Sequence, residues 1–201
     1  MIVEFARDVL DQGQLDPKQL PRTLLGVKFW RMTSGLFDDR LLHQAEMLGD
    51  LCLSGEHSVV TAESCTGGLI AALCTSVSGS STWFVAGLVT YTLDAKQQIL
   101  GVSADTLATH GAVSEPVASE MALAALRRSP ATLSVSVTGV AGPGGGDVSH
   151  PVGTVWFGWA RKTGQEIQLM QTSRHQLHGD RGEVRSGATR VAMNGLIKLL
   201  Q

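Results

Sequence analysis

The chain has 201 residues, a length that suits one domain, and its 16 Lys and Arg against 18 Asp and Glu give a formal net charge of −2. This balance argues against a protein that holds nucleic acid mainly through bulk charge, since such domains are strongly basic. Hydrophobic residues make up 43% of the chain and charged residues 17%, a composition that can bury a core and excludes a disordered chain.

The cysteines and the hydropathy pattern point to a cytoplasmic protein. Cys52, Cys65 and Cys74 form no CxxC pair, which argues against a disulfide framework or a zinc ribbon and favours a reducing compartment. No apolar run approaches the roughly 20 residues that cross a bilayer. The first residues, MIVEFARD, carry acids early and do not resemble a secretory signal. We therefore expect no membrane and no nucleic-acid partner.

Residues 1–37 differ from the rest, because they contain Pro17 and Pro21 among mixed charges. We interpret them as an N-terminal extension or arm and residues 38–201 as the main domain. Two explanations stay open. Met32 is the biological start, or the segment is a real arm that packs on the body or on another subunit.

From residue 38 onward, helical and strand patterns alternate along the chain. The expected elements are a helix over 38–53, a strand over 57–62, a helix from 66, a strand over 83–91, short helices over 94–100 and 103–109, a helix over 114–128, a strand over 133–137, a hairpin of strands 154–161 and 166–172, and a helix from 180. Asp180 and Glu183 form a capping-box pattern at the last helix start. The pattern predicts an α/β sandwich, and the hairpin makes its sheet mixed.

The segment Thr61–Gly68 is the first candidate for chemistry. A strand ends there, small residues follow and a helix begins, so a hydroxyl or thiol lies beside free backbone N–H groups. This arrangement suits an anion or a developing oxyanion together with a nucleophile. The alternative is a helix N-terminus capped by Ser64, with glycines for close packing. Cys65 is either a nucleophile or, as is more common, a buried structural cysteine.

Tyr91 and Lys96 form the second candidate. Tyr91 is the single tyrosine of the chain and ends an apolar strand, where its polar tip needs a partner. Lys96 lies at the start of a short helix, where the dipole disfavours a cation. The alternative for Lys96 is a solvated surface lysine.

The glycine-rich segment 139–146 follows a strand, at the place where α/β sheets gather ligands, but it matches no Walker loop. Arg181 and Arg185 are four residues apart on one helix face near the helix start. They suggest an anion such as a phosphate between them. The alternative is pairing with Asp180, Glu183 or other neighbours. None of the histidines has the spacing of a metal ligand set, and we expect no metal site and no cofactor.

Seven blocks of the chain together resemble the CinA C-terminal domain family, the nicotinamide-nucleotide amidases. They are TAESCTGG (61–68), SGSSTWFVAGLVTY (78–91), AK (95–96), GAVSEPVASEM (111–121), VTGVAGPGGG (137–146), PVGTVWFG (151–158) and GDR (179–181). The resemblance implies a three-layer α/β/α domain with a mixed, mostly parallel sheet. It also implies hydrolysis of the carboxamide of nicotinamide mononucleotide to nicotinate mononucleotide and ammonia, in pyridine nucleotide salvage.

The resemblance also assigns roles to residues. Ser64 is the nucleophile, Lys96 the general base, and Tyr91 lies near them as a third catalytic candidate. A lysine base needs a pKa near neutrality, which burial beside a helix N-terminus and near Arg181 would favour. The substrate-binding candidates, for the oxyanion and for the ribose phosphate and ring, are Glu63, Cys65, Thr66, Gly67, Gly68, Thr138, Gly139, Gly142, Gly144 and Arg181.

One departure from the family pattern keeps alternatives open. Leu93 stands where the family often has an amide side chain, which would alter substrate contacts or reduce activity. A non-catalytic nucleotide-binding or regulatory member is therefore one alternative, and a Ser–Lys hydrolase of another amide or ester is a second. The apolar helices and the arm make a homo-oligomer plausible.

Overall fold

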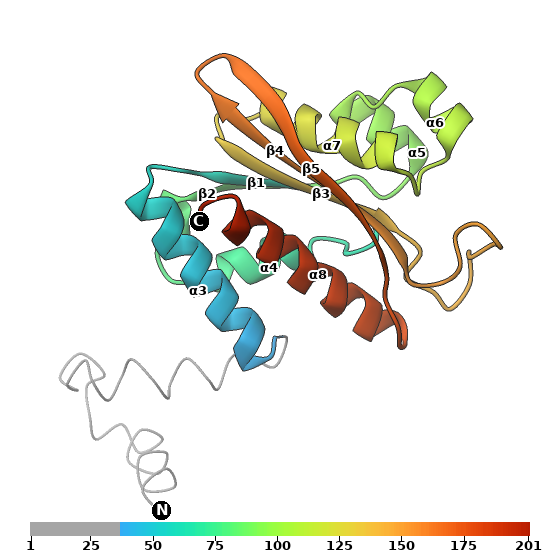
Figure 1. Ribbon diagram of the computed structural model, residues 1–201, viewed down its shortest axis with the longest axis horizontal. Helices are drawn as coiled ribbons and strands as arrows, with labels where there is room; N and C mark the ends of the chain where they lie inside the picture. The colour runs from blue at the N-terminus through green and yellow to red at the C-terminus, as the bar shows by residue number, and fades with distance from the viewer. Residues whose placement is uncertain (1–36) are drawn as a thin grey trace, which may run out of the picture. The chain divides into compact units, whose positions relative to one another are not determined.

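The computed structural model describes residues 37–201, of which residues 39–201 form one compact unit around a five-stranded sheet. The sheet has the order β2-β1-β3-β4-β5 (Figure 1). Its strands are β1 (Val59–Glu63), β2 (Phe84–Val89), β3 (Leu133–Gly139), β4 (Thr154–Thr163) and β5 (Glu166–Gln176). The β1–β2 and β1–β3 pairs are parallel, whereas β3–β4 and β4–β5 are antiparallel.

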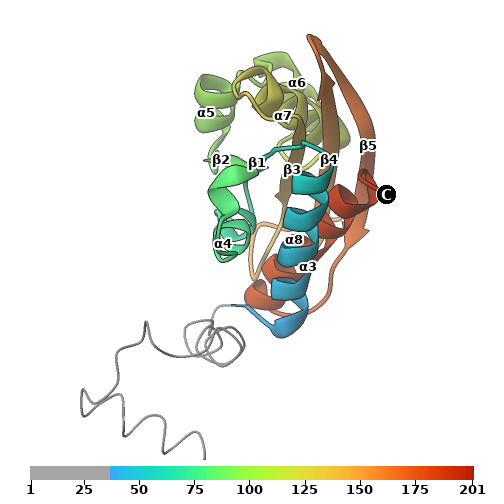
Figure 2. The same cartoon turned by 90° about the vertical axis from the view of Figure 1, so that its left-hand side faces the viewer.

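Helices cover both faces of this sheet (Figures 1 and 2). One face carries α3 (Asp39–Ser54), α4 (Leu69–Thr75) and α8 (Arg181–Lys198). The other face carries α5 (Leu93–Ala95), the π-helical turn η4 (Lys96–Leu100), α6 (Ala104–His110) and α7 (Glu115–Arg127). A 3₁₀ turn, η3 (Ser80–Thr82), precedes β2. The predicted three-layer α/β/α sandwich with a mixed sheet is confirmed. Two pairings are parallel and two are antiparallel, and β4 alone runs opposite to the other four strands of this sheet.

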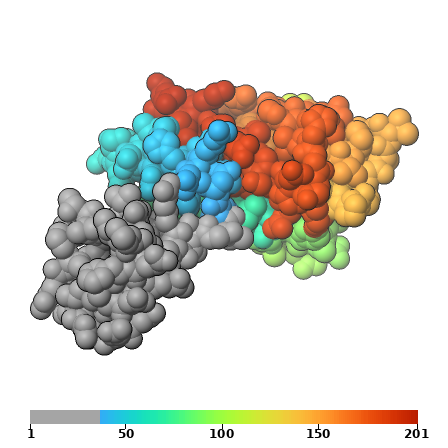
Figure 3. All heavy atoms as spheres, turned by 90° about the horizontal axis from the view of Figure 1, so that it is seen from below, coloured from blue at the N-terminus to red at the C-terminus, as the bar shows by residue number. Residues whose placement is uncertain are grey.

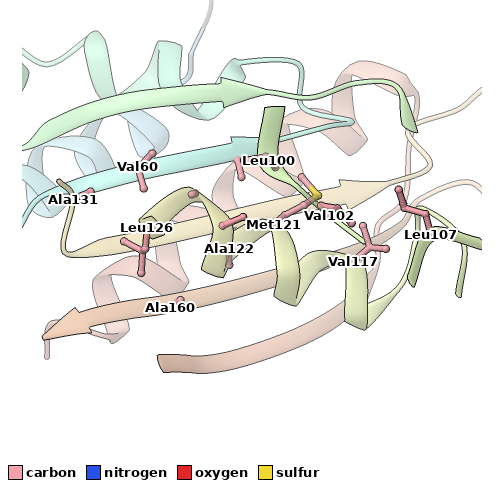
Figure 4. Close-up of a cluster of buried hydrophobic side chains, with 13 residues drawn as sticks. Val60, Leu100, Val102, Leu107, Val117, Met121, Ala122, Leu126, Ala131 and Ala160 are labelled. Atoms are coloured by element: carbon pink, nitrogen blue, oxygen red, sulfur yellow. The ribbon is translucent and has the colours of Figure 1, made fainter. Parts of the chain in front are cut away.

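The core on the α7 face is built from small and branched apolar side chains. The residues buried together include Val60 of β1, Met121 and Leu126 of α7, Leu100 at the end of η4 and Val102 after it (Figure 4). Two serine hydroxyls of β3 also face α7. Ser134 Oγ donates to Ala122 O at 2.8 Å and Ser136 Oγ donates to Ala118 O at 2.5 Å. These bonds satisfy the buried hydroxyls and tie helix to sheet.

β3 is therefore buried on both faces, although its sequence alternates apolar residues with serines. The sequence pattern predicts that at least the apolar face of this strand is buried. The serine face would ordinarily be expected to point outward. Here the buried carbonyls of Ala122 and Ala118 in α7 accept from Ser134 and Ser136, which offsets the cost of burying the two hydroxyls.

The helix boundaries differ from prediction where glycines decide the backbone. The second helix begins at Leu69 rather than at residue 66, because Gly67 and Gly68 have φ of 62° and 89°. L-residues rarely adopt this left-handed region, and it cannot continue a right-handed helix. The capping box of Asp180 and Glu183 at the start of α8 is present as predicted.

β5 runs to Gln176, four residues beyond its predicted end. Its last residues are polar and show no apolar alternation, but they continue the ladder along β4 as far as the Thr154–Gln176 pair. Backbone pairing at a sheet edge needs no apolar side chain, so sequence patterning cannot locate its end. The predicted N-terminal arm falls on residues outside the described range, except for Phe37.

Two glycines of α8 allow a matched test of packing. A Cβ at Gly195 would lie 2.1 Å from the buried ring of Trp159, whereas a Cβ at Gly187 would meet only the Leu177 side chain at 3.5 Å. We expect Gly195→Ala to lower the free energy of unfolding by about 2 kcal/mol or more through overpacking. Gly187→Ala should be neutral or raise it by up to about 1 kcal/mol through helix propensity. Urea denaturation of both variants measures this, and equal effects would contradict the packing assignment.

Candidate active site

The predicted site residues meet where the three parallel strands end. Glu63 of β1 pairs with Val89 of β2 and Val137 of β3, so the residues after them lie side by side at one sheet edge. Ligand sites in α/β sheets gather at this carboxyl edge. Side chains alternate between faces along each strand. Ser64 therefore points to the α7 face, on which Val60 and Ala62 of the same strand are packed.

Ser64 and Lys96 are in direct contact although 32 residues separate them. Lys96 Nζ lies 2.8 Å from Ser64 Oγ. Ser64 is buried and Lys96 is only 1% exposed. A nucleophile and a base within hydrogen-bond distance of each other, shielded from water, form the arrangement that an activated serine requires. The contact excludes the alternative of a solvated surface lysine.

Backbone carbonyls surround the amine of Lys96. Its Nζ donates to Thr90 O at 2.7 Å and to Tyr91 O at 3.4 Å, besides its contact with Ser64. Burial lowers the pKa of Lys96 from 10.5 to about 8, because the charged ammonium loses its water. A substantial fraction of the amine is then neutral near physiological pH. A neutral amine has two N–H groups and one lone pair. With both carbonyls accepting those N–H groups, the lone pair faces the Ser64 hydroxyl.

Sequence analysis did not identify Thr90 as part of this arrangement. Its carbonyl is the nearest acceptor of the Lys96 amine, and its own hydroxyl is buried with no hydrogen-bond partner in residues 37–201. A backbone carbonyl carries no side-chain signature. Its position in the sequence could have indicated it, because Thr90 directly follows a strand at the predicted ligand edge of the sheet. In the structure Thr90 N donates to Glu63 O at 2.8 Å.

The carboxylate of Glu63 organises the turn that carries Ser64. Glu63 is fully buried, and its two oxygens accept hydrogen bonds from two hydroxyls and three backbone N–H groups. The donors are Thr61 Oγ1, Thr66 Oγ1, Gly68 N, Ile70 N and Ala71 N. Glu63 therefore caps α4, and the prediction that Ser64 caps it was wrong. Every hydrogen bond to the Glu63 carboxylate is internal, so the predicted contact of Glu63 with substrate is not supported.

Only two of the four N–H groups predicted for an oxyanion stay available. Gly67 N donates to Ser64 O, and Gly68 N donates to the Glu63 carboxylate. In the part of the chain that the structure describes, Cys65 N and Thr66 N donate to no protein acceptor. The residue after a nucleophile commonly supplies such a donor. The Thr66 hydroxyl is bonded to Glu63.

Cys65 itself is a buried thiol. The side chain is 4% exposed, and burial raises its pKa to about 12. A thiol with this pKa holds almost no thiolate near neutral pH, so it is a poor nucleophile. This supports Ser64 over its neighbour as the reactive group.

Two arginines of α8 link the site segments. Arg181 donates to Gly142 O at 2.8 Å and to Tyr91 Oη at 2.9 Å. Arg185 donates to Thr66 O through Nη2 at 2.7 Å and Nε at 3.2 Å. The expected alternative, pairing with Asp180 or Glu183, is not what they do.

The predicted third catalytic residue, Tyr91, is 56% exposed and its hydroxyl bonds Arg181. Its carbonyl, not its phenol, faces the Lys96 amine. Leu93, which departs from the family pattern, is also exposed and lies at the first residue of α5. The tyrosine side chain is therefore exposed, with its hydroxyl bonded to Arg181 rather than to Ser64 or Lys96.

Thr138 and the tip of the glycine-rich loop differ in their exposure to solvent. Thr138 is 1% exposed and its hydroxyl donates to Ala112 O at 2.8 Å. This bond connects the loop before α7 to the sheet. Because the hydroxyl is buried and bonded internally, the predicted contact of Thr138 with substrate is not supported. Gly139 is packed against β4, whereas a Cβ at Gly144 would meet nothing within 4 Å. The loop tip extends beyond the body of the domain (Figure 3).

Residues 37–201 contain no group of three or more His, Cys, Asp or Glu side chains arranged to hold a metal ion. No helix within this range has the length and apolar character that a membrane span requires.

The comparisons with known proteins agree on one family. Residues 42–200 match the model of the CinA C-terminal domain. The chain is 47% identical over 159 residues to the nicotinamide-nucleotide amidohydrolase PncC of Escherichia coli K12, covering 79% of this chain and 94% of that protein. The chain is 54% identical over 127 residues to the nicotinamide-nucleotide amidohydrolase PncC of Enterobacter agglomerans, covering 63% of this chain and 75% of that protein. A crystal structure of the competence/damage inducible protein CihA from Agrobacterium tumefaciens superposes with a TM-score of 0.75 at 41% identity, covering 82% and 98%.

The lowered pKa of Lys96 predicts a specific pH dependence of stability. Between pH about 8 and 10.5 the unfolded chain keeps the Lys96 proton while the folded chain releases it. The free energy of unfolding should therefore rise with pH in this window, by about 3 kcal/mol in total, relative to Lys96→Met. Below pH about 8 the burial penalty is fully present. Urea titrations of both proteins at several pH values measure the difference, and parallel curves would show that the pKa of Lys96 is not lowered.

Proposed function

The chain belongs to the CinA C-terminal domain family, and from this premise we propose that it is an amidase. The substrate is nicotinamide mononucleotide, and the products are nicotinate mononucleotide and ammonia. The name of the E. coli relative supports the substrate. The buried 2.8 Å contact between Lys96 Nζ and Ser64 Oγ is the observation that carries the chemistry. The reaction would serve pyridine nucleotide salvage.

In the acylation step, Ser64 Oγ attacks the carboxamide carbon while neutral Lys96 takes the hydroxyl proton. The carbonyls of Thr90 and Tyr91 hold the two N–H groups of the amine, so its lone pair is directed at Ser64. The tetrahedral oxyanion accepts hydrogen bonds from Cys65 N and Thr66 N. These donors are held in place by the Glu63 carboxylate below the turn.

Collapse of this intermediate breaks the carbon–nitrogen bond. The Lys96 ammonium gives its proton to the leaving nitrogen, which departs as ammonia, and the nicotinoyl group stays on Ser64 as an ester. Lys96 is then neutral again and takes a proton from a water molecule that attacks the ester carbon. Release of the carboxylate returns the proton to Ser64 Oγ. One lysine thus acts as base and acid in both halves of the reaction.

Arg181, Arg185, the Tyr91 ring and the glycine-rich loop bind the nucleotide portion in this proposal. Arg181 and Arg185 carry positive charge that no carboxylate of residues 37–201 neutralises, and arginine forks suit phosphate. The exposed ring of Tyr91 offers an aromatic face between these arginines and the catalytic pair. The Gly142 carbonyl is bonded to Arg181, so the glycine-rich loop is connected to the same region.

The dyad is tested by ammonia release from nicotinamide mononucleotide with a chelator present. Ser64→Ala should lower kcat by roughly a thousandfold or more, because no nucleophile remains. Lys96→Met should lower it by at least about a hundredfold. Cys65→Ala is the matched control and should keep most of the activity. A Cys65→Ala variant as inactive as Ser64→Ala would contradict the serine nucleophile. Tight binding of the nucleotide by the unmodified protein without turnover would instead indicate the non-catalytic alternative.

The pH profile tests the base separately. Lys96 acts in its neutral form, so kcat/KM should rise with pH along a limb with an apparent pKa of about 8 and flatten above it. Below that pKa, log kcat/KM should fall by about one per pH unit. A rate that is constant from pH 6 to 9 would exclude Lys96 as the group that titrates.

A further inference from the structure

Arg181 and Arg185 are each joined to one half of the Ser64–Lys96 pair. Arg185 donates twice to Thr66 O, in the turn that carries Ser64. Arg181 donates to the phenol oxygen of Tyr91, the residue whose carbonyl accepts from Lys96 Nζ. Arg185 therefore contacts the backbone of the turn that carries Ser64, and Arg181 contacts the side chain of the residue whose carbonyl accepts from Lys96.

The charges of these arginines are not satisfied within the described residues. Their hydrogen bonds go to carbonyl and phenol oxygens, none of which carries a full negative charge. The nearby carboxylates, Asp180 and Glu183, are bonded instead to backbone N–H groups in the capping box of α8. A guanidinium has more N–H donors than these bonds use.

The position of this pair is also electrostatically unfavourable. Like charges four residues apart on a helix repel each other, and a helix start disfavours cations. A doubly charged anion between the two arginines would remove both penalties. The structure thus holds a pair of cations that hydrogen bonds connect to the segments carrying Ser64 and Tyr91.

We propose that the phosphate of the substrate activates the Ser64–Lys96 pair in addition to anchoring the nucleotide. The phosphate dianion holds Arg185 on Thr66 O and Arg181 on Tyr91, and so orders the oxyanion donors and the acceptors of the lysine amine. Binding energy from a part of the substrate that does not react is then expressed in kcat. This inference rests on the proposed amidase function and concerns how that site distinguishes a phosphorylated substrate.

The first test compares two substrates and a separate anion. Nicotinamide riboside has the same carboxamide as the mononucleotide but lacks the phosphate. Its kcat should be about tenfold lower or more, beyond any rise in KM. Inorganic phosphite, added separately, should increase riboside turnover in a saturable way. An equal kcat for both substrates, or no response to phosphite at any concentration, would overturn the proposal.

A second test uses Arg185→Gln with Lys198→Gln as the matched control. Lys198 is exposed in the last turn of the same helix, and its substitution removes the same charge far from the site. The ratio of riboside turnover with and without phosphite should fall close to one in Arg185→Gln and stay at the unmodified value in Lys198→Gln. If Arg185 only supported the fold, basal turnover would fall while this ratio remained.

The two proposals fail in different ways. Turnover of the mononucleotide without phosphite activation of the riboside leaves the amidase intact and overturns only the activating role of the phosphate. Absence of turnover with the mononucleotide itself overturns the amidase and, with it, the activation that depends on it.

Discussion

The buried carboxylate of Glu63 is the constraint on which the site depends. A charge removed from water is tolerated only when its oxygens are fully hydrogen-bonded. Here five donors from residues 61–71 converge on it, and this requirement bends the chain into a turn before α4 can start. Ser64 and the N–H groups of Cys65 and Thr66 belong to that turn. The proposed nucleophile and the proposed oxyanion donors are thus positioned by one buried side chain.

The second condition is the burial of Lys96. A lysine in water is almost fully protonated at neutral pH and cannot serve as a base. The π-helical turn that begins at Lys96 directs its side chain into the sheet edge, where loss of hydration lowers its pKa to about 8. The carbonyls of Thr90 and Tyr91 keep the amine oriented without adding a negative charge, which would raise the pKa again. Burial and uncharged acceptors together produce a usable base.

The helix α8 connects the Ser64–Lys96 pair to the proposed phosphate site. Its first residues are held by a capping box, so Arg181 and Arg185 extend from a fixed helix end. Their bonds reach Gly142, Tyr91 and Thr66, which lie in three separate segments of the chain. One helix end thereby coordinates the glycine-rich loop, the aromatic surface and the nucleophile turn. Such a connection allows the non-reacting part of a substrate to influence the reacting part.

Local sequence patterns determined the order of helices and strands, the α/β class with a mixed sheet and the capping box, since periodicity and capping act between residues close in the chain. The three-layer arrangement was implied by the family resemblance. Ordered blocks such as residues 61–68 and 137–146 also marked where chemistry would be found. The tertiary structure alone decided which groups meet: Lys96 with Ser64, Arg185 with Thr66, and Thr90 O with the lysine amine. It also directed the Glu63 carboxylate and the Thr138 hydroxyl into internal hydrogen bonds. These outcomes depend on the register of parallel strands and on burial, which arise from contacts between residues far apart in sequence and leave no local pattern.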